Sequence, residues 1–301
     1  MNDCIVIGAG AAGLSAGLTL ARARRQTLLI DAGQQSNLVA TGIGGLLGHD
    51  RRPPSEYYAA AHHELAAYPT VEVIVGEAVQ AARNPDGTFE VTLAGGRREQ
   101  AQTVVLAPGM DYRYPGVPGL AERWGTSAFH CPFCGGWEAR GRPMAVLATG
   151  NAGVHGAANL RAWTDRITLL TNGSELSADQ REMLSARGIA YDPRPVAALE
   201  GPGTDLERVS FHEGADLAVT ALLVKSTLYQ RSTLARDLGA TVTAPDDWLA
   251  VEAITVDAVG RTEIPGLYAA GDAATSIPPS MPAAVTSGYM AAAMAVGQIM
   301  K

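Results

Sequence analysis

The sequence predicts an α/β fold with two Rossmann-like, doubly wound domains. The order strand, helix, strand occurs twice along the chain, and glycines stand between the first strand and the helix of each copy. The length of 301 residues suits about two domains of ~150 residues. A composition of 47% hydrophobic and 18% charged residues excludes a disordered chain. The net charge of -7 leaves no basic face for a nucleic-acid partner.

The first copy opens the chain. An apolar strand at residues 4–7 is followed by a helix-period stretch at 12–24 and a second strand at 27–30. This order predicts two parallel strands joined by a right-handed crossover. No basic segment precedes the first strand, so the N-terminus does not resemble a signal peptide. We therefore expect the protein in the reducing cytoplasm, where three cysteines do not form a disulfide scaffold.

Turn residues indicate that an antiparallel meander extends the first sheet. Turn signals at residues 84–87 and 95–96 separate short β-type runs. They predict a meander over residues 71–100. A Pro/Gly-rich crossing at 108–119 then leads out of the first domain.

The second copy follows this crossing. Residues 144–148 and 167–170 read as strands, and residues 157–163 between them read as a helix. Further strands near 209–212 and 221–224 complete this unit.

A third glycine-rich segment, at residues 266–272, lies near the C-terminus. If it belongs to the first domain, the second domain is an insertion. The predicted bounds are then 1–115 plus 243–301 for the first domain and 116–242 for the second. Polar residues interrupt the apolar stretch at 283–300, which therefore suits a packed helix better than a membrane span. We expect no membrane association.

The glycines of the first copy match the G-x-G-x-x-G pattern of a dinucleotide-binding turn. Gly8 permits the tight turn, Gly10 lets the backbone approach a pyrophosphate at the helix N-terminus, and Gly13 lets helix and strand pack closely. Asp31 ends the next strand, where a carboxylate accepts a hydrogen bond from a ribose hydroxyl. The alternative is a tight turn without a ligand.

The glycine turn of the second copy is incomplete. Alignment of the strands places Ala148, Gly150 and Gly153 at the three glycine positions. The strand that should end in a ribose-reading residue continues into Asn172 and Gly173, which are neither an acid nor an arginine. We therefore expect a vestigial domain without bound nicotinamide.

Cys131 and Cys134 form a C-x-x-C pattern just before the second copy. Two thiols at this spacing can close a redox disulfide, and a helix N-terminus lowers the pKa of such a thiol. Half of a zinc site is the alternative. However, the third cysteine, Cys4, lies in the first strand, so with His130 at most three ligands are near. We expect no metal site.

Other candidates have structural interpretations. His62 and His63 lie in an apolar-periodic helix and are expected to be a surface pair rather than a metal site. Trp137, Trp163 and Tyr289 are expected to be core or interface aromatics.

Together these motifs resemble the low-molecular-weight thioredoxin reductase group of flavoproteins. The resemblance covers nearly the whole chain, through the N-terminal glycines, the C-x-x-C pattern and the P-G-L-Y-A-A-G-D segment. It implies an FAD-binding domain interrupted by the inserted domain, FAD contacts from Gly271 and Asp272, and a homodimer. It also implies that Cys134 meets the flavin while Cys131 attacks the substrate.

This sequence departs from the reductases at three places. Gly135 stands where the reductases have an acid, the second glycine turn lacks its first glycine, and Asn172 and Gly173 replace two arginines. In these departures the chain resembles the gliotoxin-type and holomycin-type oxidases. Those enzymes pass electrons from a small dithiol through C-x-x-C and FAD to dioxygen, without a nicotinamide.

The resemblance leaves the proton carrier open, because the oxidases have a histidine where this chain has Gly135. His130 is the best available carrier, and Glu138 is the alternative. The resemblance also places the loop at 41–45, with His49 after it, near the flavin ring.

Three functions compete. The first is FAD-dependent oxidation of a small-molecule dithiol to a disulfide. The second is an NADPH-dependent thioredoxin-type disulfide reductase. The third is a flavin-binding sensor whose C-x-x-C reports redox state without turnover. We expect the first, while the substrate and the final electron acceptor, whether dioxygen, ferredoxin or another carrier, stay open.

Overall fold

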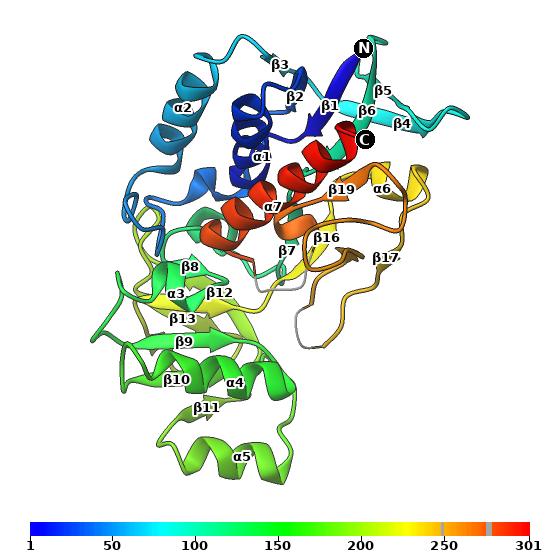
Figure 1. Ribbon diagram of the computed structural model, residues 1–301. Coiled ribbons are helices and arrows are strands. Elements are labelled where there is room, and N and C mark those ends of the chain that lie inside the picture. The colour runs from blue at the N-terminus through cyan, green and yellow to red at the C-terminus, as the bar shows by residue number, and fades with distance from the viewer. Residues whose placement is uncertain (248–249, 275–278) are drawn as a thin grey trace. The chain divides into compact units, whose positions relative to one another are not determined.

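The computed structural model describes residues 1–247, 250–274 and 279–301 (Figure 1). Its contacts divide the chain into two compact units. The first unit contains residues 1–38, 52–112 and 228–301, and the second contains residues 39–51 and 113–227. Each unit is built on a sheet with parallel strands, so the predicted α/β class with two Rossmann-like domains is confirmed.

A seven-stranded sheet forms the centre of the first unit. Its strands are β1 (Asn2–Ile7), β2 (Thr27–Asp31), β3 (Val71–Val75), β4 (Ala78–Arg83), β5 (Phe89–Leu93), β6 (Arg98–Leu106) and β19 (Leu267–Ala269). The order is β3-β2-β1-β6-β5-β4, and β19 pairs with β6. Because β19 is parallel to β6, and β6 is parallel to β1, the third glycine-rich segment leaves the same sheet as the first.

The meander predicted over residues 71–100 is wrong in its first strand. β3 runs parallel to β2, and only β4, β5 and β6 pair antiparallel. Valine and glutamate alternate at the start of β3, which fits a half-exposed strand of either direction, so the sequence did not reveal the direction. β6 belongs to both parts, because it pairs antiparallel with β5 and continues, buried, between β1 and β19.

Helices cover the first unit's sheet (Figure 1). They are α1 (Ala11–Arg22), α2 (Pro54–Leu65), α6 (Leu234–Asp237), α7 (Met281–Ile299) and the 3-10 turns η1 (Ser36–Val39) and η3 (Gly271–Ala273). α1 and α7 lie side by side, and a Cβ atom on Gly288 would stand 2.0 Å from the carbonyl oxygen of Ala12. The apolar C-terminal stretch is therefore a packed helix, as predicted. Among the described residues, no helix is long and apolar enough to cross a membrane.

The third cysteine lies inside the first unit. Cys4, in β1, is fully buried and carries a free thiol. Burial raises the pKa of this thiol to about 12.

The second unit has a five-stranded parallel sheet in the order β11-β10-β9-β15-β8. Its strands are β8 (Ala128–Phe129), β9 (Met144–Leu147), β10 (Ile167–Leu170), β11 (Ala190–Asp192) and β15 (Ala221–Val224). Its helices are α3 (Pro132–Gly135), α4 (Gly150–Leu160), α5 (Ala178–Ser185) and the 3-10 turn η2 (Ala121–Arg123).

Two predictions for the second unit need correction. The crossover helix begins at Gly150 rather than at residue 157, because the glycine turn itself opens the helix. The strand near 209–212 does not complete the parallel sheet. It belongs to a separate antiparallel sheet of β12 (Val196–Glu200), β13 (Arg208–Phe211) and β14 (Leu217–Ala218).

The unit bounds differ from the predicted domain bounds at three places, and at the first of them residues 113–115, predicted in the first domain, group with the second unit. Residues 228–242 group with the first unit, because Leu228, Leu234 and Leu238 join the core around its sheet. Residues 39–51 group with the second unit. The remaining short strands are β7 (Met110–Arg113), paired with β16 (Thr227–Gln230), and β17 (Val242–Thr243), paired with β18 (Ala253–Ile254).

Candidate functional site

The turn from β1 to α1 gives each of its three glycines a different role. Gly8 has φ +103°, and a Cβ atom there would stand 2.1 Å from the carbonyl oxygen of Ala107. A Cβ atom on Gly13 would stand 1.7 Å from the carbonyl oxygen of Gly8. Gly10, by contrast, has no atom within 4 Å of such a Cβ position. The open space at Gly10, at the N-terminus of a twelve-residue helix, fits a pyrophosphate.

Asp31 ends β2, as predicted, and its carboxylate is held from several sides. Oδ1 accepts hydrogen bonds from the backbone N–H of Gly33 at 2.8 Å and from Nε2 of Gln35 at 3.0 Å. Nε2 of His62, on α2, lies 3.3 Å from Oδ2. The sequence did not reveal a role for Gln35, and His62 was expected to be a surface residue.

Gly271 and Asp272 lie against the start of α1. Gly271 has φ +70°, and a Cβ atom there would stand 2.9 Å from the Cβ of Ala12. Its N–H donates to Oγ of Ser287 on α7 at 2.9 Å. The structure therefore gathers this segment and the β1–α1 turn in one place, although more than 250 residues separate them in sequence.

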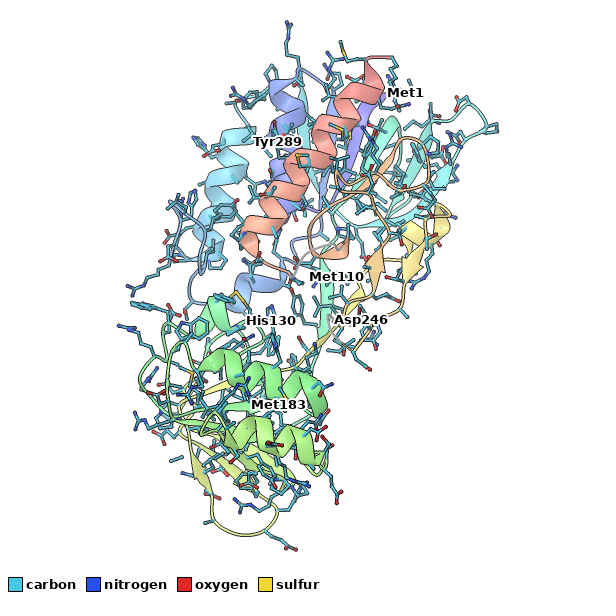
Figure 2. All side chains as sticks on the ribbon, turned by 60° about the horizontal axis from the view of Figure 1, so that its bottom comes forward. Met1, Met110, His130, Met183, Asp246 and Tyr289 are labelled. Carbon is cyan, nitrogen blue, oxygen red and sulfur yellow. A yellow bond between two sulfur atoms is a disulfide. The ribbon has the colours of Figure 1, made fainter. Side chains whose placement is uncertain are left out.

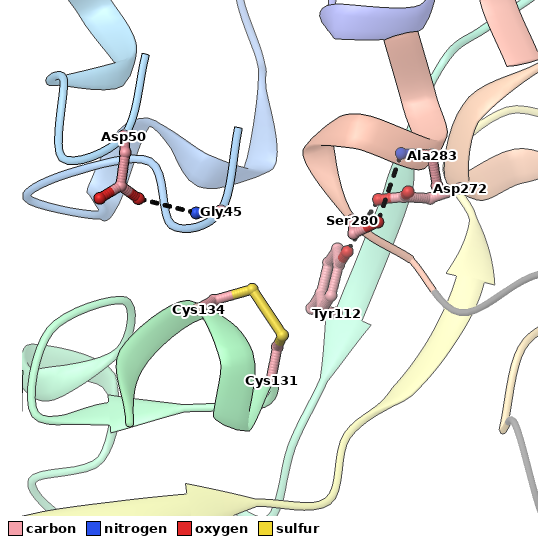
Figure 3. Close-up of a disulfide and its surroundings, with 8 residues drawn as sticks. All are labelled: Gly45, Asp50, Tyr112, Cys131, Cys134, Asp272, Ser280 and Ala283. Carbon is pink, nitrogen blue, oxygen red and sulfur yellow. Dashed lines mark hydrogen bonds between the residues drawn. A yellow bond between two sulfur atoms is a disulfide. The ribbon is translucent and has the colours of Figure 1, made fainter. Parts of the chain in front are cut away.

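The Asp272 carboxylate is buried and has a partner that the sequence did not reveal. The Tyr112 hydroxyl donates to Oδ2 of Asp272 at 2.9 Å (Figure 3). Burial raises the pKa of Asp272, while the hydrogen bond from Tyr112 acts in the opposite direction. Burial also raises the pKa of Tyr112 well above its ordinary value. Tyr112 therefore stays protonated and available as a donor at neutral pH.

Asp272 is expected to make the unfolding free energy of the apoprotein fall as pH rises. A carboxyl whose pKa is higher in the folded state binds its proton more tightly there. Its contribution is therefore lost between the ordinary pKa, about 3.9, and the raised one. Urea unfolding at several pH values should show this fall, and Asp272→Asn should remove it.

A carboxyl of opposite behaviour provides the control. The Arg194 side chain donates to Asp192 and lowers the pKa of that carboxyl, so Asp192→Asn should remove a dependence of the opposite sign. If wild type and Asp272→Asn keep a constant difference in unfolding free energy across the pH range, the raised pKa of Asp272 is contradicted.

The C-x-x-C pattern forms a disulfide in the second unit. Cys131 is the extended N-cap residue of the short helix α3, Cys134 lies inside this helix, and their Cα atoms are 5.3 Å apart (Figure 3). Among the described residues, no group of three or more His, Cys, Asp or Glu side chains is placed to bind a metal ion. A disulfide between two cysteines at this spacing is suited to thiol–disulfide exchange.

Aromatic rings close the space beside α3. A Cβ atom on Gly135 would stand 2.5 Å from Cδ1 of Phe129, and one on Gly136 would stand 2.8 Å from Cδ2 of Trp163. Phe129 is buried, and the Trp163 ring also meets the Phe133 ring edge-on at 5.3 Å. The reductases have an acid at the position of Gly135. In this chain the Phe129 ring fills the space that such a side chain would need.

Gly135→Ala is expected to lower the unfolding free energy by about 1–3 kcal/mol, because the new methyl group overpacks against the Phe129 ring. Chemical denaturation measures this change. Gly116→Ala is the matched control, since no atom lies within 4 Å of a Cβ there. In a Phe129→Leu background the cost of Gly135→Ala should shrink, and an equal cost in both backgrounds would argue against this contact.

The loop at residues 39–51 packs on the disulfide turn of its own unit. A Cβ atom on Gly44 would stand 2.9 Å from both the Cα and the carbonyl oxygen of Cys134. The loop is held together by Asp50, whose Oδ1 accepts from the N–H of Gly45 at 2.9 Å (Figure 3). The N–H of Arg51 also donates to the carbonyl of Ile43 at 2.7 Å. This contact with Cys134 was not predicted, because nothing in the sequence joins the two segments.

His130, labelled in Figure 2, precedes Cys131. Its ring stacks on the Trp124 ring, with 5.9 Å between ring centroids. Burial lowers the pKa of His130 to about 4, so the imidazole is neutral at pH 7. A proton carrier works best with a pKa near the working pH, and this environment therefore does not favour that role for His130. The alternative carrier, Glu138, is exposed, and its backbone carbonyl accepts from Arg142 at 2.9 Å.

The remaining aromatic candidates differ in burial. Trp163 is partly buried against the second unit's core, whereas Trp137 and Tyr289 are more than half exposed and are not core residues. Tyr289 is labelled on α7 in Figure 2. The Arg140 guanidinium lies 4.0 Å from the centre of the Trp137 ring. Trp137 is therefore a surface residue with a cationic neighbour.

The end of β10 is organised by internal hydrogen bonds. Oδ1 of Asn172 accepts from the N–H of Val196 at 2.8 Å, and the Thr171 hydroxyl donates to the carbonyl of Ser174. At the start of α4, Oδ1 of Asn151 accepts from Nε2 of Gln180 at 2.9 Å.

The arginines of this part of the second unit also donate to the chain's own backbone carbonyls or acids. They are Arg161, Arg166, Arg181, Arg187 and Arg194. Each of these guanidinium groups is thus held by a partner within the second unit.

Comparisons with known proteins agree with this arrangement. The sequence model of the family described as pyridine nucleotide-disulphide oxidoreductase matches residues 2–288. Thioredoxin reductase tcpT from Claviceps purpurea is 31% identical over 313 aligned positions, which cover 99% of this chain and 94% of that protein. Thioredoxin reductase sirT from Leptosphaeria maculans is 28% identical, with 91% and 88% covered.

Solved structures give the same result. The oxidoreductase from Agrobacterium tumefaciens is 35% identical with a TM-score of 0.92, covering 99% of this chain and 98% of its own. HlmI is 33% identical with a TM-score of 0.92, covering 99% and 92%. These similarities confirm the resemblance to the thioredoxin reductase-like flavoproteins. The chain therefore belongs to the pyridine nucleotide-disulphide oxidoreductase family and is a flavin-dependent thiol-disulfide oxidoreductase.

Proposed function

We propose that this protein oxidises a small-molecule dithiol to a disulfide through Cys131 and Cys134, with bound FAD passing the electrons to dioxygen. One observation carries the proposal. The second unit presents a closed disulfide, yet its strand β10 leads into Asn172 and Gly173 instead of the acid or arginine that reads a nicotinamide dinucleotide's ribose, and Oδ1 of Asn172 accepts from the N–H of Val196. An enzyme with such a unit would take its electrons from the dithiol.

The first unit would hold the FAD. The turn at Gly8, Gly10 and Gly13 has the open space for a pyrophosphate, and Asp31 would accept from the adenosine ribose. Gly271 and Asp272, which lie against the same helix, would contact the pyrophosphate and ribitol, as the family resemblance implies. When bound, FAD supplies a two-electron acceptor for the reduced cysteine pair.

The cysteines would carry the exchange in two steps. A substrate thiolate attacks Cys131, forming a mixed disulfide, while the Cys131–Cys134 bond breaks and Cys134 leaves as a thiolate. The second substrate thiolate then attacks the substrate sulfur, releasing the disulfide product and the Cys131 thiolate. The two electrons of the substrate now reside on the cysteine pair, and the two thiol protons have been released.

The residue that carries the proton in these steps, His130 or Glu138, can be identified from the pH dependence of activity. Dithiol oxidation should be measured against pH for wild type, His130→Ala and Glu138→Gln. Because the pKa of His130 is lowered to about 4, its removal should leave the profile above pH 6 unchanged. A shifted profile in His130→Ala would instead restore the predicted role of this histidine.

The alternative function is an NADPH-dependent reductase of thioredoxin-type disulfides, a reading supported by the names of relatives such as tcpT and sirT. The two functions differ in which reductant bleaches the flavin. Anaerobic titration of the purified protein with NADPH and with dithiothreitol separates them, and peroxide formation in air by the dithiol-reduced enzyme tests the oxidase directly. A flavin that no dithiol bleaches would favour the third candidate, a sensor without turnover.

NADPH is expected to bind at least about a hundredfold more weakly than to a reductase that has both phosphate-binding arginines. Each charge-assisted hydrogen bond contributes roughly 1.5–3 kcal/mol, and Asn172 and Gly173 supply none of them. Calorimetric titration measures the dissociation constant. A submicromolar value would contradict this expectation and favour the NADPH-dependent reductase.

Partners and location follow from the same proposal. The ligand would be a small dithiol or disulfide, and no nucleic acid is expected. By resemblance we propose a homodimer in the cytoplasm, with the exposed Tyr289 on α7 available to an interface.

A further inference from the structure

We propose that His62 and Gln35 are positioning residues for ribose recognition, because together they fix the Asp31 carboxylate so that one of its oxygens accepts a ribose hydroxyl. The inference rests on the proposed function only in requiring that the first unit bind a cofactor with an adenosine ribose. It does not depend on the dithiol, on the cysteine pair or on the electron acceptor.

The contacts of Asp31 leave an acceptor position open for a ligand. An ionised carboxylate offers about four acceptor positions. Oδ1 already accepts from the N–H of Gly33 at 2.8 Å and from Nε2 of Gln35 at 3.0 Å. Oδ2 has Nε2 of His62 at 3.3 Å as its neighbour and keeps a position for a further donor. A ribose hydroxyl would therefore bond to the oxygen that His62 contacts.

Gln35 links the two segments that one dinucleotide would touch. Its Nε2 donates both to Oδ1 of Asp31 and, at 3.2 Å, to the carbonyl oxygen of Ala9 in the glycine turn. The pyrophosphate would lie at that turn and the ribose at the end of β2. Gln35 therefore sets the spacing between the two subsites before any ligand arrives. Such preorganisation favours binding, because fewer side chains lose freedom when the ligand binds.

The position of His62 on α2 explains why it faces Asp31. Tyr58 is buried on α2 and donates to Oδ1 of Asn37 at 2.8 Å, which ties the helix to the loop after β2. His62 follows Tyr58 by four residues and therefore lies on the same face of the helix. Only 32% of the His62 side chain and 13% of the Asp31 side chain are accessible, whereas the neighbouring His63 is exposed.

The chain thus supplies a matched pair of histidines. His62 and His63 share the helix, the residue type and the sequence neighbourhood, and among the described contacts only His62 reaches Asp31. A merely structural contact between His62 and Asp31 would change the stability of the apoprotein and would be indifferent to the ribose hydroxyls. A positioning role requires a coupling between His62 and those hydroxyls.

The experiment measures that coupling with ADP and 2′,3′-dideoxy-ADP as probes, titrated calorimetrically into the apoprotein. Wild type is expected to bind ADP roughly tenfold or more tightly than the dideoxy analogue, because a hydrogen bond to a charged acceptor is lost. His62→Ala and Gln35→Ala should reduce this preference to under about threefold, as should Asp31→Asn. His63→Ala should keep the preference.

One further variant and a melting curve guard the result against unfolding. His62→Gln retains a donor and should restore most of the preference. The apoprotein melting temperature shows which variants are folded, and FAD release measured by fluorescence should follow the order of the ADP preferences. A full preference in folded His62→Ala would overturn the inference, and so would an equal loss in His63→Ala. If wild type binds neither ADP nor FAD, the proposed flavin function itself fails, so the two failures are distinct.

Discussion

Replacing Cys131 or Cys134 with serine is expected to abolish dithiol oxidation, lowering turnover by at least about a thousandfold. A hydroxyl group cannot take the place of the second sulfur in a disulfide, so neither the mixed disulfide nor its resolution can proceed. Turnover with dithiothreitol in air, followed as peroxide formation, measures the loss. The serine variants should still bind FAD, because the cysteines lie outside the glycine turn.

Cys4→Ala is the matched control for these variants. Cys4 is fully buried in β1, and burial raises the pKa of its thiol to about 12, so its removal should not affect thiol exchange. Full activity in Cys131→Ser or Cys134→Ser would contradict the proposed exchange. Equal losses in all three variants would indicate a folding defect rather than lost chemistry.

The second large effect is expected at Gly10. Gly10→Val should yield a folded protein that binds FAD at least about a hundredfold more weakly, because the side chain enters the space where the pyrophosphate approaches the helix N-terminus. The apoprotein has room for this side chain, since no atom lies within 4 Å of a Cβ at Gly10. Flavin absorbance of the purified protein and circular dichroism of its fold measure the two properties separately.

Gly13→Ala provides the contrast within the same turn. Its Cβ would stand 1.7 Å from the carbonyl oxygen of Gly8, so this smaller change is expected to disrupt the β1–α1 packing and the fold itself. A folded Gly10→Val protein that still binds FAD, and is therefore yellow, would contradict the assignment of the pyrophosphate to this turn. A stable Gly13→Ala protein would show that the turn can open, which its geometry does not suggest.

The sequence was informative wherever local spacing fixes the structure. Gly8, Gly10 and Gly13 lie within one strand–turn–helix unit, and the close contact of a Cβ on Gly13 with the carbonyl oxygen of Gly8 arises inside that unit. The same holds for Cys131 and Cys134, which the first turn of α3 brings within disulfide distance.

Side chains that reach the site from distant segments were not predictable. Tyr112 meets Asp272 across 160 positions, and no periodicity marks such a contact. Phe129 beside Gly135 was missed for a different reason. The sequence shows that Gly135 has no side chain. That the Phe129 ring occupies the space there follows only from the position of the strand before α3.

The direction of β3 shows a third limit. Its start, Val71-Glu72-Val73, predicts a strand with one covered face, and such a strand can have either a parallel or an antiparallel neighbour. The choice depends on which edge of the sheet the chain reaches after α2, and this is a property of the whole unit.

The burial of Cys4 determines which cysteines of the enzyme can take part in thiol–disulfide exchange. Only thiolates attack disulfides, and a thiol with a pKa of about 12 is almost entirely protonated under cellular conditions. The third sulfur therefore cannot exchange with Cys131 or Cys134 to trap the pair in a wrong bond. Cys131 and Cys134 are therefore the only cysteines of the chain that can store a pair of reducing equivalents as thiols, and Cys4 stays a protonated thiol whether that pair is oxidised or reduced.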